Sequence, residues 1–141
     1  MYLYTTHPSL CSRLLTSLLC AASVTASPAF AADEAPAMRE QGALQYRCGG
    51  IGKDESTAMR SAMKDYPLSL LFAAQDGEYL ADLTVTIEGG KQTQTFTASG
   101  PVCLLKLPAG SYTVSATTKD GQNQKRQVRV GAKHQSLDLR F

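Results

Sequence analysis

The stretch Leu107–Val114 (LPAGSYTV) decides the fold of this chain, because it has the form of a strand, a tight turn and a second strand. Pro108 has no amide hydrogen to donate to a β-ladder and marks a point where a strand stops. Gly110 can adopt the positive φ that a chain reversal commonly needs. Tyr112 and Val114 then share one face at a period of two residues. The stretch therefore predicts a small antiparallel β-protein.

Strand-like segments separated by turns extend on both sides of this stretch. Apolar runs or alternating apolar and polar residues mark seven of them, at residues 68–74, 79–88, 93–98, 102–107, 112–118, 124–130 and 135–141. Turn signals such as Gly89-Gly90 and Asp120-Gly121 recur about every eight to twelve residues, which is typical of a β-sandwich. We therefore expect residues 68–141 to form a mainly β domain with two stacked sheets.

A short strand and a helix are predicted for residues 44–67, ahead of the β region. The strand ends at Gly49–Gly52 (GGIG), and the helix follows over residues 53–65, with acidic residues near its start and basic residues near its end. Met59 and Met63 lie on one side of this helix at helical spacing. We expect the helix to pack on the sandwich, with these two methionines over an open end or edge.

Residues 1–31 have the features of a secretory signal peptide. The apolar run at residues 14–22 is shorter than the roughly 20 residues that cross a bilayer. An A-x-A cleavage signal ends at Ala31. The alternatives are an uncleaved membrane anchor and a lipoprotein modified at Cys11 or Cys20. We expect cleavage near Ala31 and a periplasmic or secreted protein.

After cleavage, residues 32–43 would form a flexible N-terminal lead, because they are small or charged and show no periodicity. No later run is apolar enough for a transmembrane helix. The formal net charge of the chain is +2, which is too small a positive field to attract nucleic acid or an anionic membrane. A basic cluster at Lys125, Arg126 and Arg129 is explained by protection of an edge strand. We therefore expect one domain without a membrane span or a nucleic-acid partner.

Cys48 and Cys103 remain after cleavage, and an exported protein can bridge them. A bridge would stabilise the fold by about 2–4 kcal/mol, provided that the two Cα atoms lie close enough. The alternative is a pair of separate buried or free thiols. A catalytic thiol would need a base beside it, and His134 is the only histidine after residue 31.

The LPAGSYTV stretch resembles the L-P-x-G-x-Y-x-V signature of carboxypeptidase regulatory-like domains, also called prealbumin-like or transthyretin-like. Residues 68–141 carry this resemblance. Gly49–Gly52, residues 79–82 and Gly100-Pro101 extend it to small exported proteobacterial proteins that contain the domain. The resemblance implies a seven-stranded antiparallel Greek-key β-sandwich of Ig-like architecture. It implies attachment to another molecule rather than catalysis, because such modules usually stabilise or bind a partner.

The catalytic sets of related families do not match this sequence. A zinc carboxypeptidase needs a His-x-x-Glu pair and a distant histidine, whereas Gln135–Leu137 follow His134 here. Transthyretin-like hydrolases of the urate pathway use several histidines and a terminal Tyr-Arg-Gly-Ser, whereas this chain ends with Asp138–Phe141. We therefore expect no catalytic residue, no cofactor and no enzyme activity.

Two metal sites are weaker alternatives. The first combines the sulfur and imidazole ligands that copper accepts, from Met38, Met59, Met63 and His134. The second combines carboxylates that suit calcium, from Asp76, Glu78 and Asp82. A buried helix stripe and a solvated turn explain the same residues without a metal.

Two functions follow as hypotheses. The first is a non-catalytic binding or assembly module of the cell envelope, with an unidentified protein or glycan as its partner. The second is a small periplasmic metal-binding protein or enzyme that uses His134 with nearby Met, Asp or Glu side chains. A purely structural role without a ligand is a third possibility. The missing catalytic sets favour the first hypothesis, because function depends on sites rather than on the fold.

Overall fold

The computed structural model describes residues 35–141, which form nine strands, one α-helix and one turn of 3-10 helix. In chain order the elements are β1 (Arg39–Gln41), β2 (Leu44–Gly49), α1 (Lys53–Ala62), η1 (Met63–Asp65), β3 (Leu68–Ala73), β4 (Leu83–Gly89), β5 (Gln92–Ala98), β6 (Val102–Lys106), β7 (Gly110–Thr117), β8 (Asn123–Val130) and β9 (Gln135–Arg140). The signal peptide and cleavage site expected in residues 1–31 lie outside the described residues. Within residues 35–141, no helix is long and apolar enough to cross a membrane.

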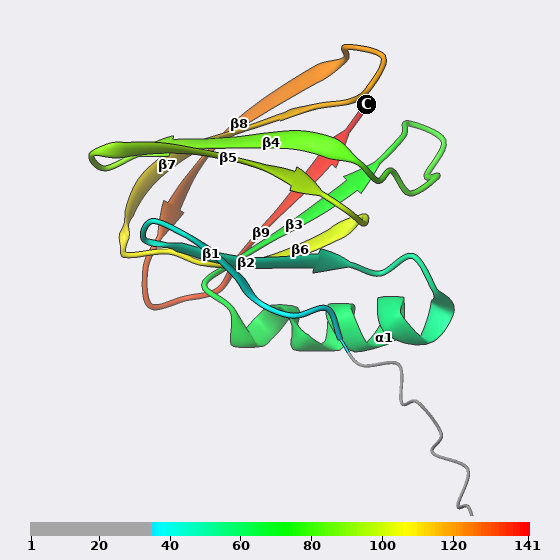
Figure 1. Cartoon of the computed structure of the whole chain (residues 1–141), viewed down its shortest axis with the longest axis horizontal. Coiled ribbons are helices and arrows are strands. Elements are labelled where there is room, and N and C mark those ends of the chain that lie inside the picture. The colour runs from blue at the N-terminus through cyan, green and yellow to red at the C-terminus, as the bar shows by residue number, and fades with distance from the viewer. Residues whose placement is uncertain (1–34) are drawn as a thin grey trace, which may run out of the picture. The chain divides into compact units, whose positions relative to one another are not determined.

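The strands lie in two stacked sheets, so the expected mainly β sandwich is confirmed (Figure 1). The five-stranded sheet has the order β1-β2-β6-β3-β9, and the four-stranded sheet has the order β5-β4-β7-β8. The hairpins β4–β5 and β7–β8 stay within the four-stranded sheet. Residues 79–82, which were expected to begin a strand, form a loop instead. Asp82 there has a φ of 58°, which is incompatible with an extended strand.

One strand pair departs from the expected antiparallel arrangement. β3 and β9 run parallel, with Leu68 opposite Gln135 and Phe72 opposite Leu139. Both strands begin at the same end of the sheet, where the amide of Gln135 donates to the carbonyl of Pro67 at 2.9 Å. An alternating side-chain pattern identifies a strand but does not give its direction. The sequence therefore could not distinguish the two arrangements.

The main core lies between the two sheets. It consists of the inward-facing apolar side chains of both sheets, among them Leu44, Leu70, Phe72, Val85, Ile87, Phe96, Val114 and Leu139. The rings of Tyr46 and Phe96 stack with their centroids 4.1 Å apart and join β2 to β5 across the core. The strands from β2 to β9 contribute alternate residues to this core, which is the periodicity that predicts a strand.

A second buried cluster lies on the outer face of the five-stranded sheet, which α1 covers (Figure 1). Met59 is 1% exposed and belongs to this cluster together with Val102 and Leu104 of β6. Since β6 is the central strand of its sheet, the expectation that Met59 and Met63 cover an end or edge is wrong. β6 is buried on both faces, which explains why its sequence is an apolar run without alternation.

Arg39–Gln41 form a strand, although a flexible lead was expected over residues 32–43. Gly42 has a φ of 59° and turns the chain, so that Gln41 pairs with Leu44. β1 satisfies backbone groups that β2 would otherwise present as an open edge. All three of its residues are exposed, so no apolar periodicity marks this strand in the sequence. β2 is the short strand predicted ahead of the helix, and it joins the five-stranded sheet together with β1. The sandwich in the described part of the chain therefore has nine strands instead of seven.

The LPAGSYTV stretch connects a strand of one sheet to a strand of the other sheet. It does not join two neighbouring strands of the same sheet. β6 ends at Lys106 in the five-stranded sheet, and β7 begins at Gly110 in the four-stranded sheet. Gly110 does not adopt the expected positive φ. Instead, the hydroxyl of Tyr112 donates to the carbonyl of Pro108 at 2.7 Å and closes the corner. A corner between layers spreads the reversal over several residues, so this glycine needs no left-handed conformation.

Candidate functional site

His134 lies between β8 and β9, and both of its ring nitrogens face protein atoms. Nδ1 lies 2.7 Å from the carbonyl oxygen of Tyr66, and Nε2 lies 3.4 Å from Oγ of Ser69. A carbonyl only accepts hydrogen bonds, so Nδ1 carries a proton. Ser69 is fully buried and is not accessible as a nucleophile. The imidazole therefore attaches the turn before β9 to β3 and does not present a free base or metal ligand.

The methionines considered as copper ligands belong to the second buried cluster. Met59 is buried there, while Met38 and Met63 are partly buried against it. Met38 accepts a weak hydrogen bond from the hydroxyl of Tyr66 at 3.8 Å. These side chains fill the layer between α1 and the sheet, which explains them without a metal.

The carboxylates considered for calcium make separate contacts. Asp76 accepts a hydrogen bond from the amide of Glu78 at 3.1 Å, as in an Asx turn. Asp82 forms an exposed ion pair with Lys119 at 3.0 Å. Among residues 35–141, no three His, Cys, Asp or Glu side chains are placed to hold a metal ion.

Cys48 and Cys103 form a disulfide with an S–S distance of 2.00 Å. The two residues are register partners on β2 and β6, and both are buried in the main core. The structure thereby selects the bridge from the two alternatives that the sequence left open. Neither sulfur is a free thiol, so neither is a candidate nucleophile.

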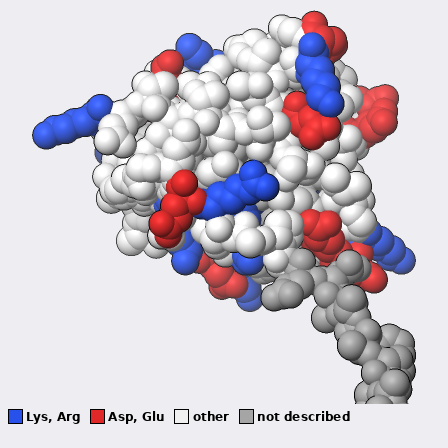
Figure 2. Space-filling model, viewed as in Figure 1, with Lys and Arg blue, Asp and Glu red and all other residues white. Residues whose placement is uncertain are grey.

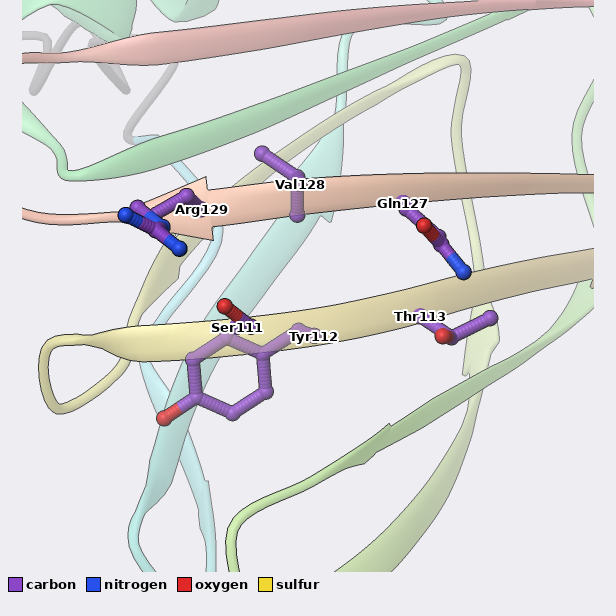
Figure 3. A pocket seen from close by; sticks show the side chains of 6 residues that line it. All are labelled: Ser111, Tyr112, Thr113, Gln127, Val128 and Arg129. Atoms are coloured by element: carbon purple, nitrogen blue, oxygen red, sulfur yellow. The ribbon is translucent and has the colours of Figure 1, made fainter.

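A hollow of about 330 Å³ lies between β7 and β8, at one edge of the four-stranded sheet. Figure 3 shows its lining side chains, which belong to Ser111, Tyr112, Thr113, Gln127, Val128 and Arg129. They point in different directions from the two strands rather than toward a common point. Lys125, Arg126 and Arg129 are exposed on the edge strand β8, as expected for protection against pairing. The convergent groups that mark a binding site are not found in this hollow.

Three turns meet at one end of the sandwich and border a cavity of about 370 Å³, which we call the end cavity. They are the β1–β2 turn, the β4–β5 turn and the β6–β7 corner, at the left-hand end in Figure 1. The lining residues are Gly42, Ala43, Gly89, Gly90, Lys91, Gln92, Gln94, Leu107, Pro108, Ala109 and Tyr112. The LPAGSYTV stretch thus supplies one wall of a cavity whose volume is typical of small-molecule sites.

The apolar part of the end cavity comes from the β6–β7 corner. Leu107, Pro108 and Ala109 line it together with the ring of Tyr112. This ring is held by the hydrogen bond of its hydroxyl to Pro108 and by contact with the backbone of Gly89, its register partner on β4. The apolar wall is therefore fixed before a ligand arrives, which lowers the entropy cost of binding.

The polar part of the end cavity comes from two glutamines of β5. Gln94 is 9% exposed and faces inward at the end of the core, and its Nε2 donates to Oε1 of Gln92 at 3.3 Å. This is the one hydrogen bond of the Gln94 side chain within residues 35–141, although an amide offers two donors and an oxygen with two lone pairs. Gly42 passes close to both amides, because a Cβ atom there would lie 2.7 Å from each of them.

The end cavity is nearly uncharged. Among the described residues of its lining, Lys91 is the only charged one, and it is exposed at the β4–β5 turn. Figure 2 shows a basic side chain projecting from this left-hand end, and the visible surface beside it is mostly uncharged. The lining offers no pairing of a nucleophile with a base. Its amides and apolar surface suit the binding of a neutral ligand.

Gln92 and Gln94 were not predicted as site residues from the sequence. One signal was present: Gln94 alternates with Phe96 and Ala98 along β5, so a polar side chain occupies an inward position of the strand. The cavity itself could not be predicted, because its three turns are far apart in the sequence and meet only in the folded chain.

The comparisons with known proteins do not assign a family. No protein-family model matches the chain, and a search of the curated proteins finds no relative. A β-sandwich by itself does not define an activity, so the function must be inferred from the geometry of the end cavity.

Proposed function

We propose that this chain is a non-catalytic binding module of the cell envelope, which holds a protein or glycan partner in the end cavity. One observation carries the proposal. The Gln94 amide is 9% exposed, borders the cavity and makes a single protein hydrogen bond within residues 35–141. No nitrogen or oxygen of the Gln94 side chain is both fully buried and without a partner, so water can satisfy the rest of the amide. A ligand that replaces this water would form hydrogen bonds in a partly desolvated site, where each contributes about 0.5–1.5 kcal/mol.

The chemistry of the lining supports binding rather than catalysis. Its titratable side chains are Lys91 and Tyr112, and the hydroxyl of Tyr112 is already bonded to Pro108. His134 contacts Tyr66 and Ser69 outside this lining. General acid–base catalysis requires a group within hydrogen-bond reach of the reacting atoms, and the side chains here are better placed to orient a ligand than to move its protons.

We also propose that the domain is of the carboxypeptidase regulatory-like type, with Greek-key topology. The LPAGSYTV stretch supports this assignment. So does the strand order, since β3 neighbours β6 and β4 neighbours β7, although neither pair is consecutive in the chain. Long connections between antiparallel neighbours are a feature of Greek keys. β1 and β2 would then be additions to seven common strands.

We place the protein in the periplasm or outside the cell, after cleavage near Ala31. The pattern of residues 1–31 supports export. The Cys48–Cys103 bridge is compatible with an oxidising compartment. Mass spectrometry of the protein purified from its native host should give an N-terminus near Ala32, whereas an N-terminus that retains residues 1–31 would reject this placement.

Site-specific photo-cross-linking tests whether the end cavity binds a partner. A photoreactive phenylalanine analogue replaces Lys91, which is exposed and lines the cavity. A matched variant carries the analogue in place of Lys125, which is exposed on β8 and does not line the cavity. The full chain is expressed in its native host and irradiated in living cells. We expect an adduct from the Lys91 position alone, and adducts from both positions or from neither would reject the cavity as the binding site.

A further inference from the structure

We propose that the end cavity binds the acetamido group of an N-acetylated amino sugar. This inference rests on the proposed function, because it names the ligand class of the same site. An acetamido group has one carbonyl acceptor, one N–H donor and one methyl group. The lining offers a counterpart for each: the amides of Gln92 and Gln94, and the apolar surface of the β6–β7 corner.

The Gln94 side chain can bond one side of a ligand amide. The N–H and C=O of a trans secondary amide point in opposite directions, so they reach two different partners. One N–H of Gln94 is used toward Gln92 at 3.3 Å, which leaves its second N–H to donate to the ligand carbonyl. The amide oxygen of Gln92 accepts the bond from Gln94 and has a second lone pair for the ligand N–H. Because Gln94 is 9% exposed, these bonds would form in a partly desolvated site, where a missing partner is costly.

The apolar wall complements the rest of such a sugar. Leu107 and Pro108 offer aliphatic surface to the methyl group, whose burial there is favourable. The ring of Tyr112 offers an aromatic face to the C–H groups of a pyranose. A ligand with a polar amide and an apolar methyl thus uses both parts of the lining.

Charge and position disfavour other ligand classes. Within residues 35–141 the lining has no acidic side chain for a cationic ligand, and the single exposed Lys91 is a weak anchor for a phosphate. One common way to bind a peptide is to add it as a strand to the open edge of a sheet. Three turns border the end cavity, and the edge strand β5 reaches it only with its first residues, so the lining offers little of such an edge. An N-acetylated sugar therefore fits the site better than a peptide.

Titration of the full chain, exported and purified with its disulfide intact, tests the inference. The probes are N-acetylglucosamine and two sugars without the acetyl group, glucosamine and glucose. We expect N-acetylglucosamine to bind with a Kd on the order of 1 mM, as is reasonable for a single sugar unit. The other two sugars should bind at least tenfold more weakly, because the Gln94 amide then has no amide partner. Calorimetry gives the affinities, and amide chemical shifts give the location.

Three variants test whether the affinity for N-acetylglucosamine depends on the side chains that line the end cavity. Gln94→Leu and Gln92→Leu remove one amide each and keep a similar volume, and each should weaken binding of N-acetylglucosamine at least tenfold. Gln127→Leu removes an exposed amide of β8 outside the cavity and should leave binding unchanged. If Gln94→Leu does not fold, Gln92→Leu decides the question, since Gln92 is exposed.

The outcomes separate this inference from the proposed function. Equal binding of the three sugars, no binding at all, or unchanged binding by the folded cavity variants would show that the acetamido assignment is wrong. If the Lys91 position nevertheless cross-links to a protein, the binding function stands and only its ligand class changes. If no adduct forms and no sugar binds, both proposals fail.

Discussion

The ring of Tyr112 on β7 lies directly against the backbone of Gly89 on β4. The two residues are register partners, and a Cβ atom at Gly89 would lie 3.0 Å from Cγ of Tyr112 and 2.7 Å from the carbonyl oxygen of Ser111. The ring therefore occupies the space that a side chain at Gly89 would need, as aromatic residues do beside glycines in other sheets. Since its hydroxyl also bonds to Pro108, one side chain connects the sheet, the corner and the end cavity.

Replacing Gly89 with alanine should destabilise the protein by about 1–3 kcal/mol, because the new methyl group must displace the ring or the backbone. Gly110→Ala is the matched control, because it places a methyl group beside the same Tyr112 ring. A Cβ atom there would make ordinary contact with Tyr112 at 3.5 Å, and Gly110 has no positive φ. The control should change stability by no more than about 0.5 kcal/mol. Urea unfolding compares the two variants, and equal losses would contradict the packing described here.

Local patterns were sufficient to predict the strands after residue 68 and the helix after Gly52. Alternation, glycine turns and helical spacing are properties of neighbouring residues, so the sequence shows them directly. The sheet to which a strand belongs is a property of the whole chain. The LPAGSYTV stretch illustrates the difference: its strands were located correctly, but the turn between them crosses from one sheet to the other.

The candidate site was less predictable than the fold. Pro108 and Tyr112 were singled out for the fold, and they line the cavity only because the β1–β2 and β4–β5 turns come beside the corner. Gln94 was recognisable as a polar residue in an inward position, but the sequence does not show whether a neighbour satisfies its amide. The Cys48–Cys103 pairing likewise depended on the distance between Cα atoms, which is 4.1 Å in the fold.

Reduction of the Cys48–Cys103 bridge should lower the free energy of unfolding by about 4 kcal/mol. The bridge spans 55 residues, and closing a loop of this length removes that much conformational entropy from the unfolded chain. Urea unfolding with and without a reducing agent measures the loss. The double variant Cys48→Ala, Cys103→Ala is the control and should unfold identically in both conditions. A wild-type protein that is insensitive to reductant would show that the bridge does not stabilise it.

The folded protein should become less stable in acid because Asp120, in the β7–β8 turn, becomes protonated. Hydrogen bonds from the Thr118 hydroxyl, which is the larger effect, and from the Gln122 side chain hold the pKa of this carboxyl below its usual value of 3.8. A depressed pKa in the folded state contributes stability above the unfolded pKa. This contribution is lost as the pH falls from about 4 through the folded pKa.

NMR titration of the Asp120 carboxyl carbon measures this effect. Thr118→Val should raise the pKa of Asp120 toward its usual value more than Gln122→Leu does, because the Thr118 hydroxyl contributes more. The Asp120→Asn variant should show a weaker dependence of stability on pH below about 4 than the wild type. A wild-type pKa at or above the usual value would contradict the hydrogen bonds in this turn.

Met59→Ala should cost about 2–5 kcal/mol, since it leaves a cavity between α1 and the central strand β6. Met63→Ala is the matched control one helical turn later. Met63 is only partly buried, so its loss should be less than half as large. Because Met59 packs over Val102 and Leu104 in the middle of the sheet, its removal should lower hydrogen-exchange protection in β6 as well as in α1. Loss of protection confined to α1 would instead mean that the helix is an independent cover and that the second buried cluster contributes little to the stability of the sandwich.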